Sequence, residues 1–380
     1  MRGRVLLLAA LTLLAPAPAL ASAPPAVSAP AYLVAGPSGD VLAQRAAGER
    51  RAPASITKLM TAVVTLEHAR PGETVTVPAI ASGVGESSIR LRAGELLSVR
   101  ELLAAALIQS ANDAAYALAA HVGRGNVARF VRMMNAKARK LGLADSRFVR
   151  PDGLDAPGHY MSAKDVLVLA RAALKRPLVR QLVRKRSARI AGGRVLSTWN
   201  DLLGSFRGLL GVKTGHTARA GWCEVAFARR DGVGVWAVVL GSRDRARRNR
   251  DLARLLNWGF AQYVRVQAIA RGRTYATASV PFSDDPLPLV ARARSHVTVR
   301  KDAPLVEEVI APVVVRAPVR RGERVGLVLV REGRRTVARS PLVAAREVRA
   351  PSFAARAGWY AGRAVDEGRR MLRDLFGAVL

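Results

Sequence analysis

Residues 53–58 constrain the fold most, because they place a hydroxyl and an ammonium three positions apart at the start of a predicted helix. Residues i and i+3 share one face of a helix, so Ser55 and Lys58 can meet. A lysine whose pKa is lowered can take the proton of a serine and make that serine a nucleophile. The same spacing also fits a serine that caps a helix and a solvated lysine. The helix itself is predicted from apolar residues at helical spacing, namely Leu59, Met60, Val63, Val64 and Leu66.

A second polar motif, Ser110-Ala111-Asn112, separates two apolar segments that are predicted to be helices. The first begins at a capping box formed by Ser98 and Glu101 and runs to Gln109, and the second covers residues 114–122. Polar side chains on a short connection between buried helices need partners in the interior. We therefore expect Ser110 and Asn112 to face other polar groups.

The third motif, Lys213-Thr214-Gly215, follows the apolar run 209–212. A strand that ends this way presents an ammonium and a hydroxyl to a cleft, and Gly215 lets a substrate approach the backbone. Each motif alone is common, but all three occur in one order, separated by 55 and 103 positions. The conjunction indicates one site.

The N-terminus has the pattern of a secretory signal peptide at residues 1–21, followed by a leader rich in Pro and Ala at 22–30. Arg2 and Arg4 precede an apolar run at 5–14, and small residues at 19–21 offer a cleavage site. No later segment reaches about 18 uninterrupted apolar residues, so we expect an exported protein that is not transmembrane.

Composition indicates a folded protein, since half of the residues are hydrophobic. The length of 380 residues suffices for two domains. The net charge of +33 is the difference between 61 basic and 28 acidic residues. Eight of the basic residues are Lys, and the Arg residues are scattered through every segment. This distribution favours solubility and attraction to anionic lipid and wall polymers, and we expect no nucleic-acid partner. The single cysteine, Cys223, lies in an apolar run and is predicted to be a buried hydrophobe.

The remaining segments predict strands and helices on either side of a boundary near residue 264. Hairpins are expected at 31–34 with 41–44 and at 222–228 with 233–240, and helices are expected at 126–141, 162–174 and 251–263. Residues 264–351 alternate Val, Thr and Arg in short runs, which is typical of a small all-β domain. Residues 352–380 predict a basic, aromatic amphipathic helix that anchors the protein to a membrane surface or docks on the β domain.

The three motifs are those of the penicillin-recognising serine enzymes. The chain resembles the low-molecular-weight penicillin-binding proteins of the 5/6 type, which are D-alanyl-D-alanine carboxypeptidases. The resemblance rests on ERRAPASITKLMTA, LLAAALIQSANDAAYALAAHVG, FVRMMNAKARKLGL, GLDAPGHYMSAKDVLVLAR and GLLGVKTGHTARAGWC. It implies an α/β (α+β) fold, in which a transpeptidase-like catalytic domain at 31–263, with an antiparallel sheet flanked by helices, precedes the β domain and the terminal helix.

The resemblance also implies a role for each motif residue. Ser55 attacks the carbonyl of the D-Ala-D-Ala bond, and Lys58 takes its proton. Ser110 relays a proton to the leaving D-alanine or from the deacylating water, and Asn112 holds the peptide. Lys213 supplies positive field to Ser110 and to the substrate carboxylate.

Four further residues are expected around the substrate carboxylate and the oxyanion. Thr214 offers a hydroxyl to the carboxylate, Gly215 belongs to the same motif, and Arg248 is a further candidate for carboxylate binding. The backbone N–H groups of Ser55 and His216 would form the oxyanion hole. The resemblance implies peptidoglycan pentapeptide as substrate, β-lactams as covalent inhibitors, no metal or cofactor, and a place at the periplasmic or extracytoplasmic face of the membrane.

Three other functions compete with this one. A class A β-lactamase needs a glutamate to activate the deacylating water, and no Glu occurs between Glu101 and Glu224. A non-catalytic wall-binding protein would have lost Ser55, Lys58 or Lys213, and all three are present. A DD-endopeptidase uses the same chemistry, so the sequence does not exclude this function.

Overall fold

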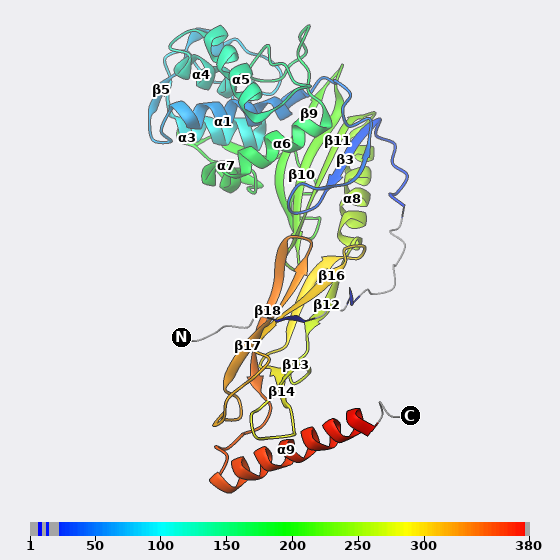
Figure 1. The fold of residues 1–380 in the computed structure, drawn as a ribbon. Coiled ribbons are helices and arrows are strands. Elements are labelled where there is room, and N and C mark those ends of the chain that lie inside the picture. The colour runs from blue at the N-terminus through cyan, green and yellow to red at the C-terminus, as the bar shows by residue number, and fades with distance from the viewer. Residues whose placement is uncertain (1–6, 10–12, 15–22, 377–380) are drawn as a thin grey trace. The chain divides into compact units, whose positions relative to one another are not determined.

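The computed structural model describes residues 7–9, 13–14 and 23–376. The chain divides into two compact units, one formed by Ser22–Gln262 and the other by Met1–Ala21 with Tyr263–Leu380. Figure 1 shows the helices gathered mainly in the first unit and the strands of the second unit running toward the C-terminal helix.

A five-stranded antiparallel sheet forms the centre of the first unit, in the order β4-β3-β11-β10-β9. Its strands are β3 (Ala31–Ala35), β4 (Val41–Arg45), β9 (Leu209–Thr217), β10 (Gly221–Arg230) and β11 (Val233–Ser242). Both predicted hairpins are confirmed, because β3 pairs with β4 and β10 pairs with β11. Helices α6 (Ala163–Leu174) and α8 (Arg245–Ala261) both contact this sheet and lie on opposite sides of it in Figure 1.

The residues of α1 (Lys58–His68) from Lys58 to Thr65 are all buried, and the remaining helices of this unit pack on α1 or on helices that contact it. They are α2 (Ala79–Ser82), α3 (Val99–Ala104), α4 (Asn112–Val122), α5 (Val127–Leu141) and α7 (Pro177–Leu182). Two short hairpins complete the unit, β5 (Thr74–Thr76) with β6 (Leu96–Ser98) and β7 (Ser187–Arg189) with β8 (Val195–Ser197). A 3₁₀ turn, η3 (Ala191–Gly193), joins β7 to β8.

Side-chain caps fix where the helices begin. Ser98 and Glu101 form the predicted capping box of α3, and Asn126 and Ser162 accept backbone N–H groups at the starts of α5 and α6. Helix α8 begins at Arg245, six residues before the predicted start, because the Asp244 side chain accepts the N–H of Arg247 at 2.7 Å. The arginine-rich first turn has no apolar periodicity, so the pattern did not reveal it.

The leader is bound to this unit. The backbone N–H and the hydroxyl of Ser28 donate to Asp251 Oδ2 at 2.9 and 2.8 Å, and Ala29 N donates to the same oxygen at 2.8 Å. A buried carboxylate on α8 therefore holds the segment that precedes β3.

The second unit has its own sheet, in the order β1-β16-β17-β18-β14-β13, with β2 also paired to β16. Its strands are β13 (Thr274–Ala278), β14 (Leu287–Ala291), β16 (Leu305–Ala311), β17 (Arg324–Glu332) and β18 (Arg335–Ala344), and β12 (Tyr263–Ile269) pairs with β15 (Ser295–Arg300). Their inward side chains, among them Leu287, Leu289 and Val328, form a separate apolar core. The prediction that this segment consists mostly of short β-strands is confirmed.

The predicted signal peptide lies largely outside the described residues. Its described parts, β1 (Leu7–Ala9) and β2 (Leu13–Leu14), pair with β16. Export and cleavage stay predictions.

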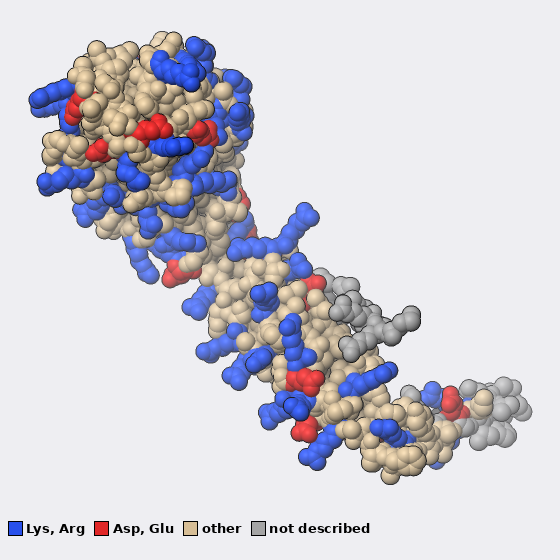
Figure 2. All heavy atoms as spheres, turned by 90° about the vertical axis from the view of Figure 1, so that its left-hand side faces the viewer, with Lys and Arg blue, Asp and Glu red and all other residues tan. Residues whose placement is uncertain are grey.

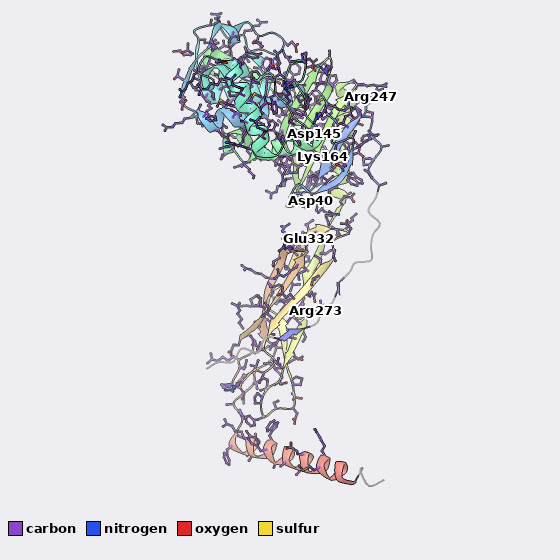
Figure 3. All side chains as sticks on the ribbon, turned by 45° about the horizontal axis from the view of Figure 1, so that its top comes forward. Asp40, Asp145, Lys164, Arg247, Arg273 and Glu332 are labelled. Carbon is purple, nitrogen blue, oxygen red and sulfur yellow. The ribbon has the colours of Figure 1, made fainter. Side chains whose placement is uncertain are left out.

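Charged side chains cover both units. Figure 2 shows Lys and Arg spread over the whole visible face and interspersed with other residues, without one large basic patch. Some are paired. Arg273, which precedes β13 (Figure 3), lies 3.0 Å from Glu307 of β16. The scattered arrangement agrees with the distribution of Arg along the sequence.

The last described element is α9 (Phe353–Phe376), a helix of 24 residues, and residues 377–380 of the predicted tail lie outside the description. Trp359 and Tyr360 make edge contacts with Phe282, at centroid distances of 5.2 and 5.7 Å. Other apolar side chains of the helix face solvent, and Phe353 is 89% and Met371 69% exposed. Among the described helices, none combines the length and apolar character needed to cross a membrane.

Candidate active site

Ser55 and Lys58 lie where the sequence predicts them, at the N-terminal end of the first helix. Ser55 belongs to a 3₁₀ turn, η1 (Ala54–Thr57), and Lys58 is the first residue of α1. Lys58 Nζ lies 2.8 Å from Ser55 Oγ, 2.7 Å from Asn112 Oδ1 and 2.8 Å from the backbone oxygen of Asp152. The 3₁₀ turn thus leads into the α-helix with both side chains on one face.

Burial changes the chemistry of Lys58. The side chain is fully buried, and this desolvation lowers the pKa of Lys58 to about 8, against the opposing charge of Asp152. A neutral amine has two N–H groups and one lone pair. The oxygens of Asn112 and Asp152 accept the two N–H groups, which leaves the lone pair for the hydroxyl of Ser55.

The second motif follows a π-helical turn, η2 (Ala105–Gln109), and this turn ends at Ser110 in the left-handed region, with φ of 67°. Such a conformation in a non-glycine residue stores strain and occurs preferentially at functional sites. Ser110 Oγ accepts a hydrogen bond from Lys213 Nζ at 2.9 Å. The side chain of Asn112 is engaged at both ends, since its Nδ2 donates to Gly85 O at 3.1 Å while Oδ1 accepts from Lys58.

Lys213 lies on β9 and is 3% exposed. Burial, together with the positive charge of Lys58, holds the pKa of Lys213 well below its usual value, and the carboxylate of Glu224 opposes this shift. The charge of Lys58 therefore disfavours the charged form of Lys213, and the carboxylate of Glu224 favours it.

Gly215 allows β9 to approach the turn that carries Ser55. A Cβ atom at this position would lie 2.9 Å from Ala54 Cβ and 3.0 Å from Ser55 N. Because Ser55 N is one of the two predicted oxyanion donors, any side chain at 215 would crowd that donor.

These elements enclose a pocket of about 240 Å³. Six of the nine predicted site residues line it, namely Ser55, Ser110, Thr214, Gly215, His216 and Arg248. The other three do not line it: Lys58 bonds to Ser55, Lys213 bonds to Ser110, and Asn112 bonds to Lys58. The structure thus brings all nine together, while their catalytic roles stay predictions.

Four pocket residues were not predicted: Glu86, Ser87, Trp199 and Trp222. The His216 ring packs on Trp222 with centroids 4.1 Å apart, and Trp199 Nε1 donates to Gln109 O at 3.0 Å. Trp222, which follows the Lys213 motif by a few residues, was an available signal, and no motif marked Trp199. Glu86 precedes the segment between Glu101 and Glu224 on which the argument against a β-lactamase rests, so that segment did not point to Glu86.

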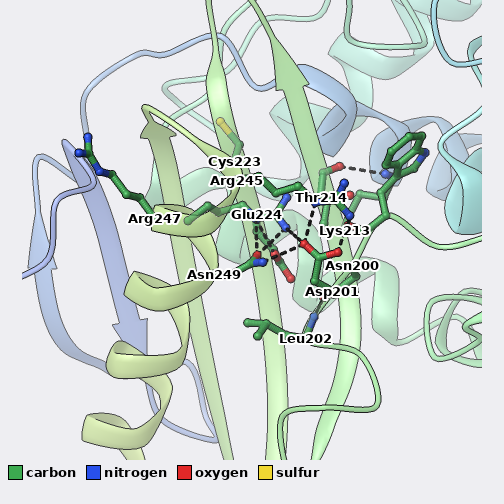
Figure 4. A network of polar contacts seen from close by, with 12 residues as sticks. Asn200, Asp201, Leu202, Lys213, Thr214, Cys223, Glu224, Arg245, Arg247 and Asn249 are labelled. Atoms are coloured by element: carbon green, nitrogen blue, oxygen red, sulfur yellow. Dashed lines mark hydrogen bonds and ion pairs between the residues drawn. The ribbon is translucent and has the colours of Figure 1, made fainter.

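Acidic and basic side chains of α8 and β10 form a network with Asp201 (Figure 4), and Arg248 of this network lines the pocket. Arg248 is 1% exposed, and its Nε lies 3.1 Å from Glu224 Oε2. Asp201 accepts from Arg245 Nε at 2.7 Å and from Asn249 Nδ2 at 2.8 Å. In the sequence, Glu224 is a single acidic residue inside the apolar run 222–228, and this unusual position was the signal that could have revealed it.

Comparisons with known proteins agree with this geometry. The model of the D-alanyl-D-alanine carboxypeptidase family, peptidase S11, matches residues 18–244. D-alanyl-D-alanine carboxypeptidase DacF of Bacillus subtilis (strain 168) is 29% identical over 342 residues, 85% of this chain and 86% of that protein.

Solved structures show the same similarity. Penicillin binding protein 5 from Haemophilus influenzae superposes with a TM-score of 0.63 at 28% identity, covering 86% of this chain and 99% of that one. Penicillin-binding protein D2 from Listeria monocytogenes, in its ampicillin-bound form, gives a TM-score of 0.56 at 33% identity and covers 62% and 98%. The predicted fold class and family are confirmed, and the chain belongs to the D-alanyl-D-alanine carboxypeptidase family.

Proposed function

We propose that the chain is a serine-type D-Ala-D-Ala carboxypeptidase that removes the terminal D-alanine from peptidoglycan stem peptides through an acyl-enzyme on Ser55. Penicillins acylate the same serine. The observation that carries the proposal is the fully buried Lys58 Nζ, 2.8 Å from Ser55 Oγ. This pair supplies a nucleophile and a base matched to neutral or slightly alkaline pH.

In the acylation step, Ser55 Oγ bonds to the carbonyl carbon of the scissile peptide and its proton passes to Lys58 Nζ. The carbonyl oxygen gains negative charge, which the backbone N–H groups of Ser55 and His216 would stabilise, at about 3 kcal/mol per donor. When the C–N bond breaks, the electron pair leaves with the amine of D-alanine.

The leaving amine needs a proton, and Ser110 is the proposed relay. Its hydroxyl accepts from Lys213 Nζ, so Ser110 can pass its own proton to the amine while Lys213 stabilises the oxygen left behind. Water then attacks the ester carbonyl carbon and gives its proton to the Ser110 oxygen. The bond to Ser55 Oγ breaks, Lys58 returns the proton to Ser55, and the shortened peptide leaves with a new carboxylic acid.

The C-terminal carboxylate of the substrate would bind at Thr214 and Arg248, near the field of Lys213. Thr214 and Arg248 both line the pocket. Asn112 would hold the peptide backbone once its Nδ2 no longer donates to Gly85 O and donates to the substrate instead.

The test is incubation of the purified protein with a muropeptide ending in D-Ala-D-Ala, following free D-alanine and covalent labelling by a fluorescent penicillin. We expect both signals in the wild type and neither in Ser55→Ala. Labelling that survives in Ser55→Ala would refute the mechanism. A cross-linked dimer assayed in parallel distinguishes carboxypeptidase from endopeptidase activity.

We also propose that the protein is exported and that α9 attaches it to the membrane surface. Exposed apolar residues such as Phe353 and Met371 support attachment, and arginines of the same helix would meet anionic lipid. The alternative is docking within the second unit, which the contact of Phe282 with Trp359 favours.

Sedimentation with anionic vesicles separates the two possibilities. A chain truncated after residue 351 should stay in the supernatant while the full chain sediments. Met371→Asp should weaken sedimentation, whereas the control Val41→Asp, on an exposed site of the first unit, should not. Equal sedimentation of full and truncated chains would exclude the anchor.

A further inference from the structure

Glu224 is a buried acid that the mechanism above does not use. It lies on β10 directly opposite Thr214 of β9, so the two side chains project from the same face of the sheet. Its exposed fraction is 0%. An ionised carboxylate is costly to bury without a partner of opposite charge, so its position beside the pocket requires a reason.

The contacts of Arg248 supply that reason. Arg248 Nε lies 3.1 Å from Glu224 Oε2, and its guanidinium carbon lies 5.6 Å from the centre of the Trp222 ring. Its Nε and Nη2 both donate to Asn249 Oδ1, at 3.1 and 2.6 Å, and Nη2 lies 3.5 Å from Asp201 Oδ2. Within the described part of the chain, no hydrogen bond or ion pair involves Nη1, and Arg248 lines the pocket.

The guanidinium is therefore fixed on two sides. A guanidinium is planar, so fixing Nε and Nη2 also fixes the direction of Nη1. Glu224 lies against Nε from the sheet, Asn249 accepts from both Nε and Nη2, and Asp201 lies at the Nη2 end. Asp201 is itself held by Arg245 and Asn249, so its position does not depend on Glu224.

The charges around Glu224 also favour a pairing with Arg248. Lys213 of β9 and Arg248 of α8 bring positive charge toward Glu224. Asp201 and Arg245 are the further charged groups that act on Glu224 or on Arg248. Burial raises the pKa of Glu224 to about 7, and the charge of Arg248 opposes that rise.

We infer that Glu224 is a positioning residue for the substrate carboxylate: from β10 it holds Arg248 so that the free edge of the guanidinium faces the pocket. The inference rests on the proposed function and deepens it. It assigns selectivity for a free C-terminal carboxylate to a strand residue that never touches the substrate.

The experiment compares two peptides that end in D-Ala-D-Ala, one with a free carboxylate and one with a carboxamide, on the full chain. The measure is the ratio of kcat/KM for the acid to that for the amide. In Glu224→Leu this ratio should fall about tenfold, through a higher KM for the acid, while kcat stays within about threefold.

Glu224→Gln separates orientation from charge. Its amide keeps the size and the polar end of the carboxylate, so its oxygen can still lie against Arg248 Nε although the negative charge is gone, and the ratio should stay within about threefold of the wild type. The wild-type ratio should rise as pH falls through about 7, because a neutral Glu224 leaves the site more positive, and Glu224→Gln should lack that rise.

In an Arg248→Gln background, Glu224→Leu should have no further effect on the ratio. Should Glu224→Leu fold poorly, Glu224→Met replaces it and the same ratio decides. An unchanged ratio in the apolar variant, an equal loss for acid and amide, or an equal loss in Glu224→Gln overturns the inference while the carboxypeptidase proposal stands. A wild type that releases no D-alanine overturns both.

Discussion

At the scale of single residues, the burial of Lys58 determines how acylation depends on pH. The pKa of Lys58 is lowered to about 8, and only the neutral amine can take the proton of Ser55. The neutral fraction grows as pH rises, so the second-order rate of penicillin labelling should increase roughly tenfold per pH unit below 8 and level off above it. Labelling rates between pH 6 and 9.5 test this expectation.

Lys58→Arg provides the matched control. Arginine stays protonated throughout this range, so labelling should be lost at every pH. A wild-type rate that is flat from pH 6 to 8 would show that Lys58 is not the base.

The residues that carry the proposed chemistry could be predicted from sequence because they lie in three short motifs of defined spacing. Their neighbours could not. Asp152 contributes a backbone oxygen to Lys58, and a backbone contact leaves no trace in residue type. Glu224 meets Arg248 only through the packing of α8 on the sheet, which no local pattern encodes.

At the scale of elements, the fit between β9 and η1 depends on the missing side chain at Gly215. Gly215→Ala should slow penicillin labelling by about a hundredfold, because its Cβ would displace Ser55 N and so weaken one oxyanion donor. Stopped-flow labelling measures this rate.

Gly72→Ala is the control for that substitution, since a Cβ there meets no atom within 4 Å. It should label at the wild-type rate. If Gly215→Ala labels equally fast, β9 does not define the oxyanion hole.

Elements defined by local signals were predicted well. The caps at Ser98, Asn126 and Ser162 and the two hairpins depend on residues a few positions apart, and all are confirmed. The π turn at Ala105–Gln109 was not predicted, because its apolar residues suit an α-helix equally well. Its extra residue per turn arises from packing, as does the left-handed Ser110.

At the scale of the whole molecule, two separate apolar cores imply two unfolding events. The first core belongs to Ser22–Gln262 and the second to the strands that follow Tyr263. Calorimetry should therefore show two transitions, and acylation by penicillin should raise the midpoint of only one. A chain ending at residue 262 should retain the transition that moves. One transition that shifts as a whole would show that the units unfold together.

The long sequence separation between the residues of the pocket has a consequence for the order of events in biosynthesis. Ser55 and Lys58 emerge from the ribosome long before Lys213 and Arg248, and an unfolded Lys58 has the pKa of any solvated lysine. The serine becomes reactive only when the later strands have buried its partner. A fluorescent penicillin added to cells or to a translation reaction would therefore label only finished molecules, and the time at which labelling appears would measure the maturation of the first unit.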